Sequence, residues 1–523
     1  MIGRIFTVGG LTLVSRLTGF ARDILLAAIL GAGPIADAFF VALRLPNHFR
    51  AIFAEGAFNA AFVPAYARIR QQGGPDSAKL FADRVFTLLF ASNLVLLAVA
   101  LLFTPAVIAV LAPGFSKEPS QFALAVELTR ITFPYLLLVS MVTLYGGILN
   151  ALTRFAAAAA APILLNLSMM ATLAVAFAFP TPGHAAAWGV FIAGILEVLL
   201  VGGDALRNGV MTAFRWPRWD EDVKRFFKAL VPATVGSAGV QIALFADTII
   251  ATFLAAGALS ALYYADRLNQ LPIGVIGIAV GTVLLPEMAS RIAAGDEAGA
   301  RRAQKRAIEL TLLLSIPCLV AFLLVPELIM RALFMRRAFT AADAAAAGAT
   351  LAAYTVGLVP FVLARVLSAT FLSRGDTATP VKALAVGVVV NVALKIVLMK
   401  PLAQVGLAFA TSIGVWINVA LLLWFALRAR LLSLDQRLQT STLKLLTAAA
   451  ILALALWLGE LILGPLLAPL PRFRSEALLL ALAVVGVIAY VGTIMLLFDR
   501  KWFSAFRGRP APATATAPPT AAA

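Results

Sequence analysis

The sequence predicts an all-α protein that crosses a lipid bilayer many times. Of its 523 residues, 62% are hydrophobic and only 13% are charged, and the mean hydropathy is +0.96. A typical soluble domain carries about 25% charged residues, so this composition excludes a soluble globular protein. The apolar residues also gather in segments of about 20 residues, the length that a helix needs to cross the hydrocarbon core.

Fourteen such segments follow one another, and each predicts one transmembrane helix. The predicted spans are residues 5–30, 34–66, 85–110, 122–150, 158–180, 185–206, 229–256, 260–290, 307–330, 344–372, 380–399, 404–427, 444–464 and 476–498. Arg16 and Arg22 interrupt the first segment, so we expect an uncleaved helix and not a signal peptide. Residues 506–523 are rich in Pro, Ala and Thr and are predicted to form a disordered cytoplasmic tail.

The distribution of basic residues orients the predicted helices. The chain has 42 Lys and Arg residues against 25 Asp and Glu residues, which gives a formal net charge of +17. With the N-terminus in the cytoplasm, most basic residues outside the spans fall in cytoplasmic segments, as the positive-inside rule requires. Both termini are therefore predicted to be cytoplasmic. The basic surplus reflects topology and contact with anionic phospholipids, as in loop 215–227, and does not indicate a nucleic-acid partner.

The composition gives no support for redox or metal chemistry. The chain has one cysteine, Cys318, and two histidines, His48 and His184. A disulfide framework is thereby excluded, and a Cys/His metal site is not expected. We predict that the protein uses no metal ion and no cofactor.

An internal repeat relates the two halves of the chain. Aligning the chain with itself at an offset of about 220 residues brings similar residues into register in the same order. The matched pairs are Gly33 with Gly257, Phe39-Phe40 with Tyr263-Tyr264, Val63-Pro64 with Leu285-Pro286, Arg154 with Arg374, Pro162 with Pro380, and Gly189 with Gly406. Two six-helix bundles, inserted the same way up, explain this pattern. We predict an N-lobe at residues 1–215, a C-lobe at 216–432 and two further helices at 433–505.

Arginines inside the predicted spans are the main functional signal. Arg16, Arg22, Arg44 and Arg50 all lie within the first fifty residues, and each would cost roughly 2.5–3.5 kcal/mol at the centre of a lipid-exposed helix. They must therefore face water, a carboxylate or an anionic ligand. Because a guanidinium makes two-pronged contacts with phosphate, such a set suits a phosphate-bearing substrate.

Carboxylates lie at helical spacing from these arginines. Arg16 and Asp23 are seven residues apart and share a helix face, and Asp37 and Arg44 share the same spacing. The pair of Asp37 with Arg44 also fits a purely structural role. Further along the second span, Pro46 is predicted to kink the helix.

The second repeat carries matching polar residues. They are Asp266, Arg267, Asn269 and Pro272, and we expect the polar clusters of both halves to meet in one cleft. Asp247 fits either the lining of that cleft or a bridge between helices. Lys395 and Lys400 lie near the end of the eleventh span and are predicted to snorkel toward water.

Several longer strings resemble those of the MurJ (MviN) lipid II flippase family. They are SRLTGFARD at residues 15–23, GAG at 31–33, DAFFVA at 37–42, LPN at 45–47, IFAEGAF at 52–58, YYADRL at 263–268, GTVLLP at 281–286 and TPVK at 379–382. The resemblance covers most of the chain, and its strings are long enough to be specific.

The resemblance implies a 14-helix member of the multidrug/oligosaccharidyl-lipid/polysaccharide (MOP) exporter superfamily. It implies a transporter and not an enzyme, one that flips lipid II, an undecaprenyl-diphosphate-linked disaccharide-pentapeptide, from the cytoplasmic to the periplasmic leaflet of the bacterial inner membrane for peptidoglycan synthesis. Residues 433–505 would form a groove for the lipid tail. The implied substrate-binding residues are Arg16, Arg22, Asp23, Asp37, Arg44, Asn47, Arg50, Glu55 and Arg267.

Three other functions fit part of the sequence pattern. A flippase for another polyprenyl-diphosphate oligosaccharide and a cation-coupled multidrug exporter would keep the fold, but an exporter of cations needs an acidic cleft. A membrane enzyme acting on polyprenyl diphosphates needs clustered carboxylates or an external catalytic domain. The driving force stays open between the membrane potential and an H⁺ or Na⁺ gradient. The peptidoglycan synthesis machinery is a candidate partner, besides lipid II and membrane phospholipids.

Overall fold

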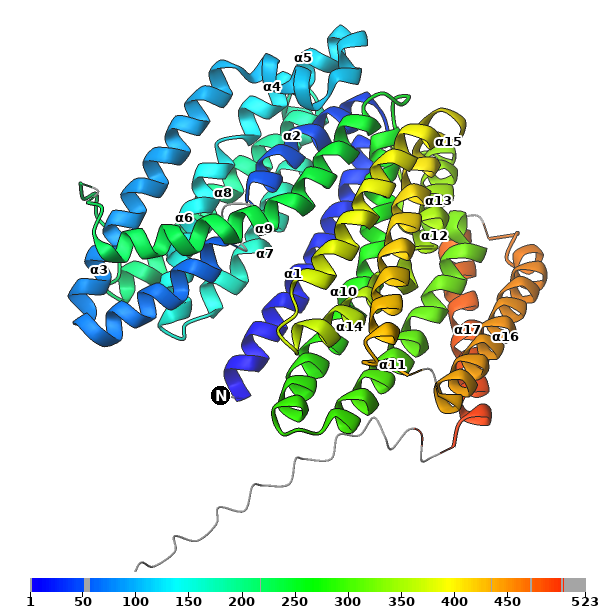
Figure 1. Ribbon diagram of the computed structural model, residues 1–523. Coiled ribbons are helices and arrows are strands. Elements are labelled where there is room, and N and C mark those ends of the chain that lie inside the picture. Colours follow the sequence, from blue (N-terminus) through cyan, green and yellow to red (C-terminus); the bar gives the residue numbers. More distant parts are fainter. Residues whose placement is uncertain are drawn as a thin grey trace, which may run out of the picture. The chain divides into compact units, whose positions relative to one another are not determined.

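The computed structural model describes residues 2–50, 57–216, 218–433, 435–470, 473–499 and 502. Every regular element in these ranges is a helix (Figure 1), so the prediction of an all-α protein is confirmed. The helices are α1 Ile2–Leu30, α2 Pro34–Arg50, α3 Ala57–Leu102, α4 Thr104–Leu111, η2 Pro113–Lys117, α5 Pro119–Thr132, α6 Tyr135–Ala151, α7 Ala156–Ala174, η3 Ala176–Ala178, α8 Pro182–Arg207, α9 Glu221–Ala251, α10 Ala258–Ala293, α11 Glu297–Leu324, α12 Pro326–Phe334, α13 Ala341–Thr355, α14 Leu358–Leu372, α15 Ala378–Arg428, α16 Gln436–Leu466 and α17 Arg474–Leu497.

Within the described residues, nine helical stretches are long and apolar enough to cross a membrane. They are Phe58–Leu102, Pro119–Ala151, Ala156–Ala174, Pro182–Arg207, Glu297–Leu324, Ala341–Leu372, Ala378–Arg428, Gln436–Leu466 and Arg474–Leu497. The protein is therefore a multi-pass membrane protein, while the count of fourteen spans stays a prediction. The predicted first span corresponds to α1, which is not among these nine stretches. Three charged residues, Arg16, Arg22 and Asp23, interrupt its apolar sequence.

Two long helices each contain a break where two predicted spans meet. In α3 the backbone of Gly74 has φ 79°, directly before Pro75. In α15 the backbone of Ala403 has φ 47°, two residues after Pro401. Each proline lacks a donor for the helical ladder, so the helix is interrupted beside it. The break at Ala403 separates the predicted spans 380–399 and 404–427.

Short polar side chains begin several of the helices. Asp220 accepts a hydrogen bond from the backbone N–H of Val223 at the start of α9, and Asp435 does the same for Leu438 at the start of α16. At the start of α13, Thr340 and Asp343 bond each other's backbone N–H in a capping box. These contacts satisfy N–H groups that have no partner within the helix.

The order of helix boundaries repeats along the chain. The short helices α4 and α12 begin at Thr104 and Pro326, and α6 and α14 end at Ala151 and Leu372. In both cases the separation is about 220 residues, the offset at which the sequence matches itself. Local structure thus follows the same duplication as the sequence.

The described helices group into two compact units. Unit 1 comprises Met1–Leu271, Val325–Gly357 and Leu384–Ile417, and unit 2 comprises Pro272–Leu324, Leu358–Ala383 and Asn418–Ala523. These units do not follow the predicted lobes at 1–215 and 216–432, because α10 and α15 each contribute to both. The division into lobes and a tail groove stays a prediction.

Each unit has its own apolar core. In unit 1 the ring of Phe62 stacks on Phe58 and Phe81 at centroid distances of 5.1 and 5.7 Å, and Phe226 meets it edge-on. In unit 2 the core joins α10, α11, α14 and the end of α15 through residues such as Met288, Leu358 and Leu422. The last two helices, α16 and α17, run side by side (Figure 1), and Gly459 of α16 faces Leu482 of α17.

We predict that Gly31→Ala destabilises the protein and Gly33→Ala does not. Gly31 follows α1 with φ +67°, and an added Cβ would lie 2.5 Å from the carbonyl oxygen of Ala338. A left-handed conformation alone costs an L-residue about 1–2 kcal/mol, so thermal unfolding of the purified protein should begin at a lower temperature. Gly33 has no neighbouring atom within 4 Å of an added Cβ. Equal unfolding temperatures for the two variants would contradict the argument.

Candidate substrate-binding site

A buried carboxylate, Asp23, joins α1 to α10 within unit 1. The Arg22 side chain beside it donates two hydrogen bonds to Asp23 Oδ1, at 3.0 Å from Nε and 2.7 Å from Nη2. Arg267 of α10 approaches the other oxygen, with 3.6 Å between Nε and Oδ2. The side chains of Arg22 and Asp23 are only 8% and 5% exposed, whereas that of Arg267 is 39% exposed. Two of the predicted site residues from α1 thus meet the predicted residue from α10.

Two polar residues complete the Asp23 network. Tyr263 donates its hydroxyl to Asp23 Oδ1 at 3.3 Å and accepts from Arg267 Nη2 at 3.1 Å. Asn166 of α7 accepts from Arg22 Nη1 at 3.0 Å and donates to the Ser15 carbonyl at 3.0 Å. The sequence interpretation did not include either residue in the site. Tyr263 could have been included, because it lies in the YYADRL string that resembles the family. Asn166 lies in none of these strings.

The network carries more positive than negative charge. Two guanidinium groups share the carboxylate of Asp23, and Asp266 beside Arg267 adds one further negative charge. Arg16 lies seven residues before Asp23 on α1 and is partly buried. Its guanidinium forms no hydrogen bond and no ion pair with a described residue. Because an uncompensated charge at membrane depth is costly, this arrangement is suited to an anionic ligand.

Asp37 has a structural partner that the sequence did not reveal. Its carboxylate accepts hydrogen bonds from the backbone N–H groups of Gly257 and Ser260, at 2.7 and 2.8 Å, and from the Ser260 hydroxyl. It therefore caps the first turn of α10, and it is only 2% exposed. The alternative of a direct Asp37–Arg44 ion pair is not formed: no ion pair joins these two described side chains, and Asp37 bonds α10 while Arg44 bonds Thr248. Without a conformational change, Asp37 is not accessible to a ligand.

Arg44 lies in a second charged cluster of unit 1. Its Nη1 donates to Thr248 Oγ1 at 3.0 Å, and next to Thr248 the carboxylate of Asp247 forms an ion pair with Lys395 of α15. Lys395 is only 1% exposed, so the prediction that it snorkels to water is wrong. The spacing of residues along one helix cannot reveal such a pair, because its members are 148 positions apart.

The remaining predicted residues lie at or beyond the end of α2. Asn47 and Arg50 are partly buried in its last turn, and the helix continues through Pro46 to Arg50. Glu55 lies outside the described residues. Among the residues that the structure does describe, no three His, Cys, Asp or Glu side chains gather as metal ligands would.

The fold matches those of solved membrane transporters. It matches a solved structure of lipid II flippase MurJ in an inward closed conformation with a TM-score of 0.78 at 23% identity, covering 94% of this chain and 98% of that chain. An inward-facing MATE family multidrug transporter of the MOP superfamily matches with a TM-score of 0.68 at 14% identity over 82% of this chain and 98% of that one. The chain thus shares the fold of this class of solved transporter structures.

Sequence relatives narrow this class to one family. The family model for lipid II flippase MurJ matches residues 26–468. A probable lipid II flippase MurJ from Rhizobium tropici is 39% identical over 526 residues, which is 98% of each chain. The lipid II flippase MurJ of Burkholderia cenocepacia is 35% identical, covering 82% of this chain and 83% of its own. The chain belongs to the MurJ lipid II flippase family, which confirms the resemblance and the prediction of a transporter and not an enzyme.

We predict that Asp247 and Lys395 are strongly coupled in stability. Removing one partner of a buried pair leaves an uncompensated charge and typically costs about 3–5 kcal/mol, whereas replacing both by apolar groups is often neutral. Lys395→Met and Asp247→Leu should each lower the thermal unfolding temperature, and the double variant should recover most of the loss. The cost for Asp247→Leu is the larger of the two, because it leaves the deeply buried Lys395 unpaired. Additive losses in the double variant would show that the two side chains do not interact.

Proposed function

We propose that this protein moves lipid II from the cytoplasmic to the periplasmic leaflet of the bacterial inner membrane, for peptidoglycan synthesis. Lipid II is an undecaprenyl diphosphate that bears a disaccharide-pentapeptide. Membership of the MurJ family supports this substrate, since the relatives from Rhizobium tropici and Burkholderia cenocepacia are both named for it.

The single observation that carries the proposal is the shared carboxylate of Asp23. Arg22 and Arg267 both contact it, Asp266 beside Arg267 supplies a second negative charge, and Arg16 on the same helix gives three guanidinium groups against two carboxylates. A diphosphate offers several charged oxygens that accept forked contacts from guanidinium groups. Binding of a diphosphate would therefore replace the missing counter-charge.

The exposures of the three arginines suggest an order of contact. Arg267 has a side chain that is 39% exposed, and Arg16 is partly buried without a partner among the described residues. These two can meet the diphosphate first. Arg22 is bonded to both Asp23 and Asn166, so it orients Asp23 and reaches the ligand only when that network rearranges. Arg44, Asn47, Arg50 and Glu55 complete the proposed binding set, and Asp37 supports it by holding α10.

The proposed topology has fourteen transmembrane helices with both termini in the cytoplasm. Spans one to six form the N-lobe and spans seven to twelve the C-lobe, which alternately open the binding site to the two sides of the membrane. The final two helices, within residues 433–505, provide a groove for the polyprenyl tail, which stays in lipid. The predicted tail, residues 506–523, lies outside the described residues. The peptidoglycan synthesis machinery receives the product.

A cation-coupled multidrug exporter is a poorer explanation of the site. Organic cations would be repelled by the surplus guanidinium charge around Asp23, and the carboxylate of Asp37 is occupied by α10. Another polyprenyl-diphosphate oligosaccharide would satisfy the same charges, so specificity for lipid II rests on the family and not on the arginines.

Replacing Arg16 with Ala should abolish transport and leave the fold intact. The variant loses a charge-assisted contact to the diphosphate worth roughly 1.5–3 kcal/mol, and no described residue depends on Arg16 for a hydrogen bond. The measurement is accessibility of the lipid II headgroup outside cells in which the variant is the sole copy. Arg154→Ala, which removes an exposed arginine from the turn after α6, is the matched control and should transport normally. Normal transport by a well-expressed Arg16→Ala protein would contradict the assignment.

We further propose that the membrane potential drives transport directly, without a coupling H⁺ or Na⁺ and without a cofactor. An anionic headgroup that moves outward across an inside-negative membrane releases about 2.3 kcal/mol per charge per 100 mV. Coupling through Asp37 would require the cap of α10 to break. In vesicles, transport should therefore stop when the potential is collapsed at constant ion gradients. Continued transport under these conditions, with loss only when an ion gradient is removed, would favour ion coupling.

A further inference from the structure

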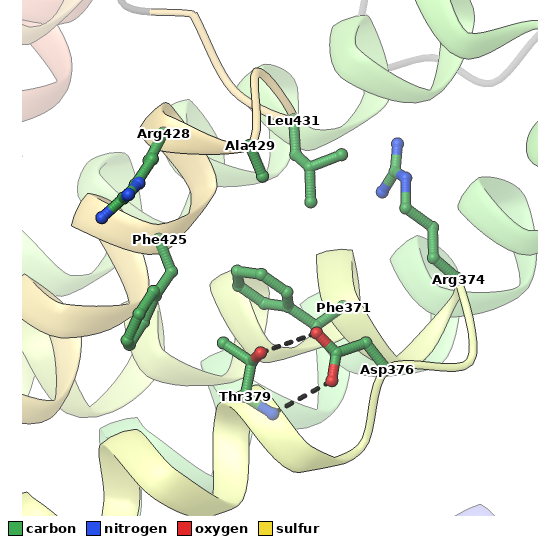
Figure 2. A pocket seen from close by; sticks show the side chains of 8 residues that line it. All are labelled: Phe371, Arg374, Asp376, Thr379, Phe425, Arg428, Ala429 and Leu431. Atoms are coloured by element: carbon green, nitrogen blue, oxygen red, sulfur yellow. Dashed lines mark hydrogen bonds between the residues drawn. The ribbon is translucent and has the colours of Figure 1, made fainter.

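A pocket in unit 2 lies outside the proposed lipid II site. It occupies about 460 Å³ between the turn that joins α14 to α15 and the C-terminal end of α15. Figure 2 shows the charged groups Arg374 and Arg428 on opposite sides of this pocket, with Phe371 between them. Its volume falls in the range of about 300–1,000 Å³ that is usual for small-ligand sites.

The one acidic group in the lining is already engaged. Asp376 accepts hydrogen bonds from the backbone N–H groups of Ala378 and Thr379, at 3.1 and 3.0 Å, and from the Thr379 hydroxyl at 2.7 Å. The hydroxyl bond, together with those from the backbone, holds the pKa of Asp376 below its usual value. Asp376 thus caps α15 and neutralises neither arginine of the pocket.

The two arginines keep donor capacity for an anion. Arg374 lines the pocket; it donates to the Thr370 carbonyl at 2.7 Å and forms an ion pair with Glu297 at 2.6 Å, and these two contacts use only two of the five N–H groups of its guanidinium. Arg428 is exposed, and its guanidinium carbon lies 5.5 Å from the ring centre of Trp424. No described residue forms an ion pair with Arg428.

The surroundings of Arg428 are those of a membrane interface. Trp424 is 51% exposed and Leu427 is 37% exposed, and both lie in the last turns of an apolar helix. An arginine stacked on an exposed tryptophan at a helix end is typical of the headgroup region. More positive charge lies close by, since Arg301 donates to the carbonyl of Arg430, two residues after Arg428.

We propose that this pocket binds the phosphate of an anionic membrane phospholipid. Arg428 and Arg374 hold the headgroup from two sides, while Trp424, Phe425 and Leu431 face its glycerol and the start of its acyl chains. A soluble phosphate would use the arginines but gain nothing from the exposed apolar residues. In the topology proposed above, this end of α15 faces the cytoplasmic leaflet, whose anionic lipids attract basic residues.

The test is lipid binding to the purified full-length protein, with native mass spectrometry as the readout. Phosphatidylglycerol should bind more tightly than phosphatidylcholine, and Arg428→Gln should weaken phosphatidylglycerol binding about tenfold, the loss of one charge-assisted contact. Arg428→Lys should retain part of the binding. Arg474→Gln, which removes an exposed arginine at the start of α17 in the same unit, is the matched control and should bind like the wild type.

Three results would overturn the proposal. One is equal binding of phosphatidylglycerol and phosphatidylcholine, and another is unchanged phosphatidylglycerol binding in the Arg428→Gln protein. The third is protection against thermal unfolding by inorganic phosphate that matches protection by phosphatidylglycerol, which would indicate a site for soluble anions. Because these measurements contain no lipid II, their failure would leave the proposed transport function untouched, and a failure of transport would not affect them.

Discussion

The contact of two arginines with one carboxylate is the interaction on which the site in unit 1 depends. Asp23 makes Arg22 and Arg267 tolerable at membrane depth, because a charge without a partner or water there is expensive. Tyr263 and Asn166 fill the remaining donor and acceptor positions, so the buried network is well satisfied in hydrogen bonds. Its positive charges still outnumber its negative charges. In the proposed function, the diphosphate of the substrate balances this surplus positive charge.

Other buried charges in the same unit stabilise the fold. Asp37 satisfies two backbone donors at the start of α10 and so positions the helix that carries Tyr263 and Arg267. The pair formed by Asp247 and Lys395 joins α9 to α15 with no excess charge of its own. The proposed substrate binding and the observed helix packing thus use the same residue types, and the difference lies in whether each charge finds a partner. Mutating any one of these residues without a stability control would confuse the two roles.

The site around Asp23 and the pocket at Arg428 place their arginines in different surroundings. Arg22 is buried and fully bonded within the protein, so its contribution is orientation. Arg428 is exposed and packs over the ring of Trp424, as expected of a side chain at the boundary between lipid and water.

The sequence alone determined the all-α membrane class, the duplication and the family, because apolar segment length, repeated order and long strings of residues are properties of the chain itself. It also indicated Arg22, Asp23 and Arg267 as members of one site. It could not assign Asp37 to the start of α10 or Lys395 to Asp247, since these partners are more than a hundred positions apart and carry no spacing signal. Only the tertiary structure decided which charges are neutralised, because the partner of a buried side chain depends on how distant helices pack.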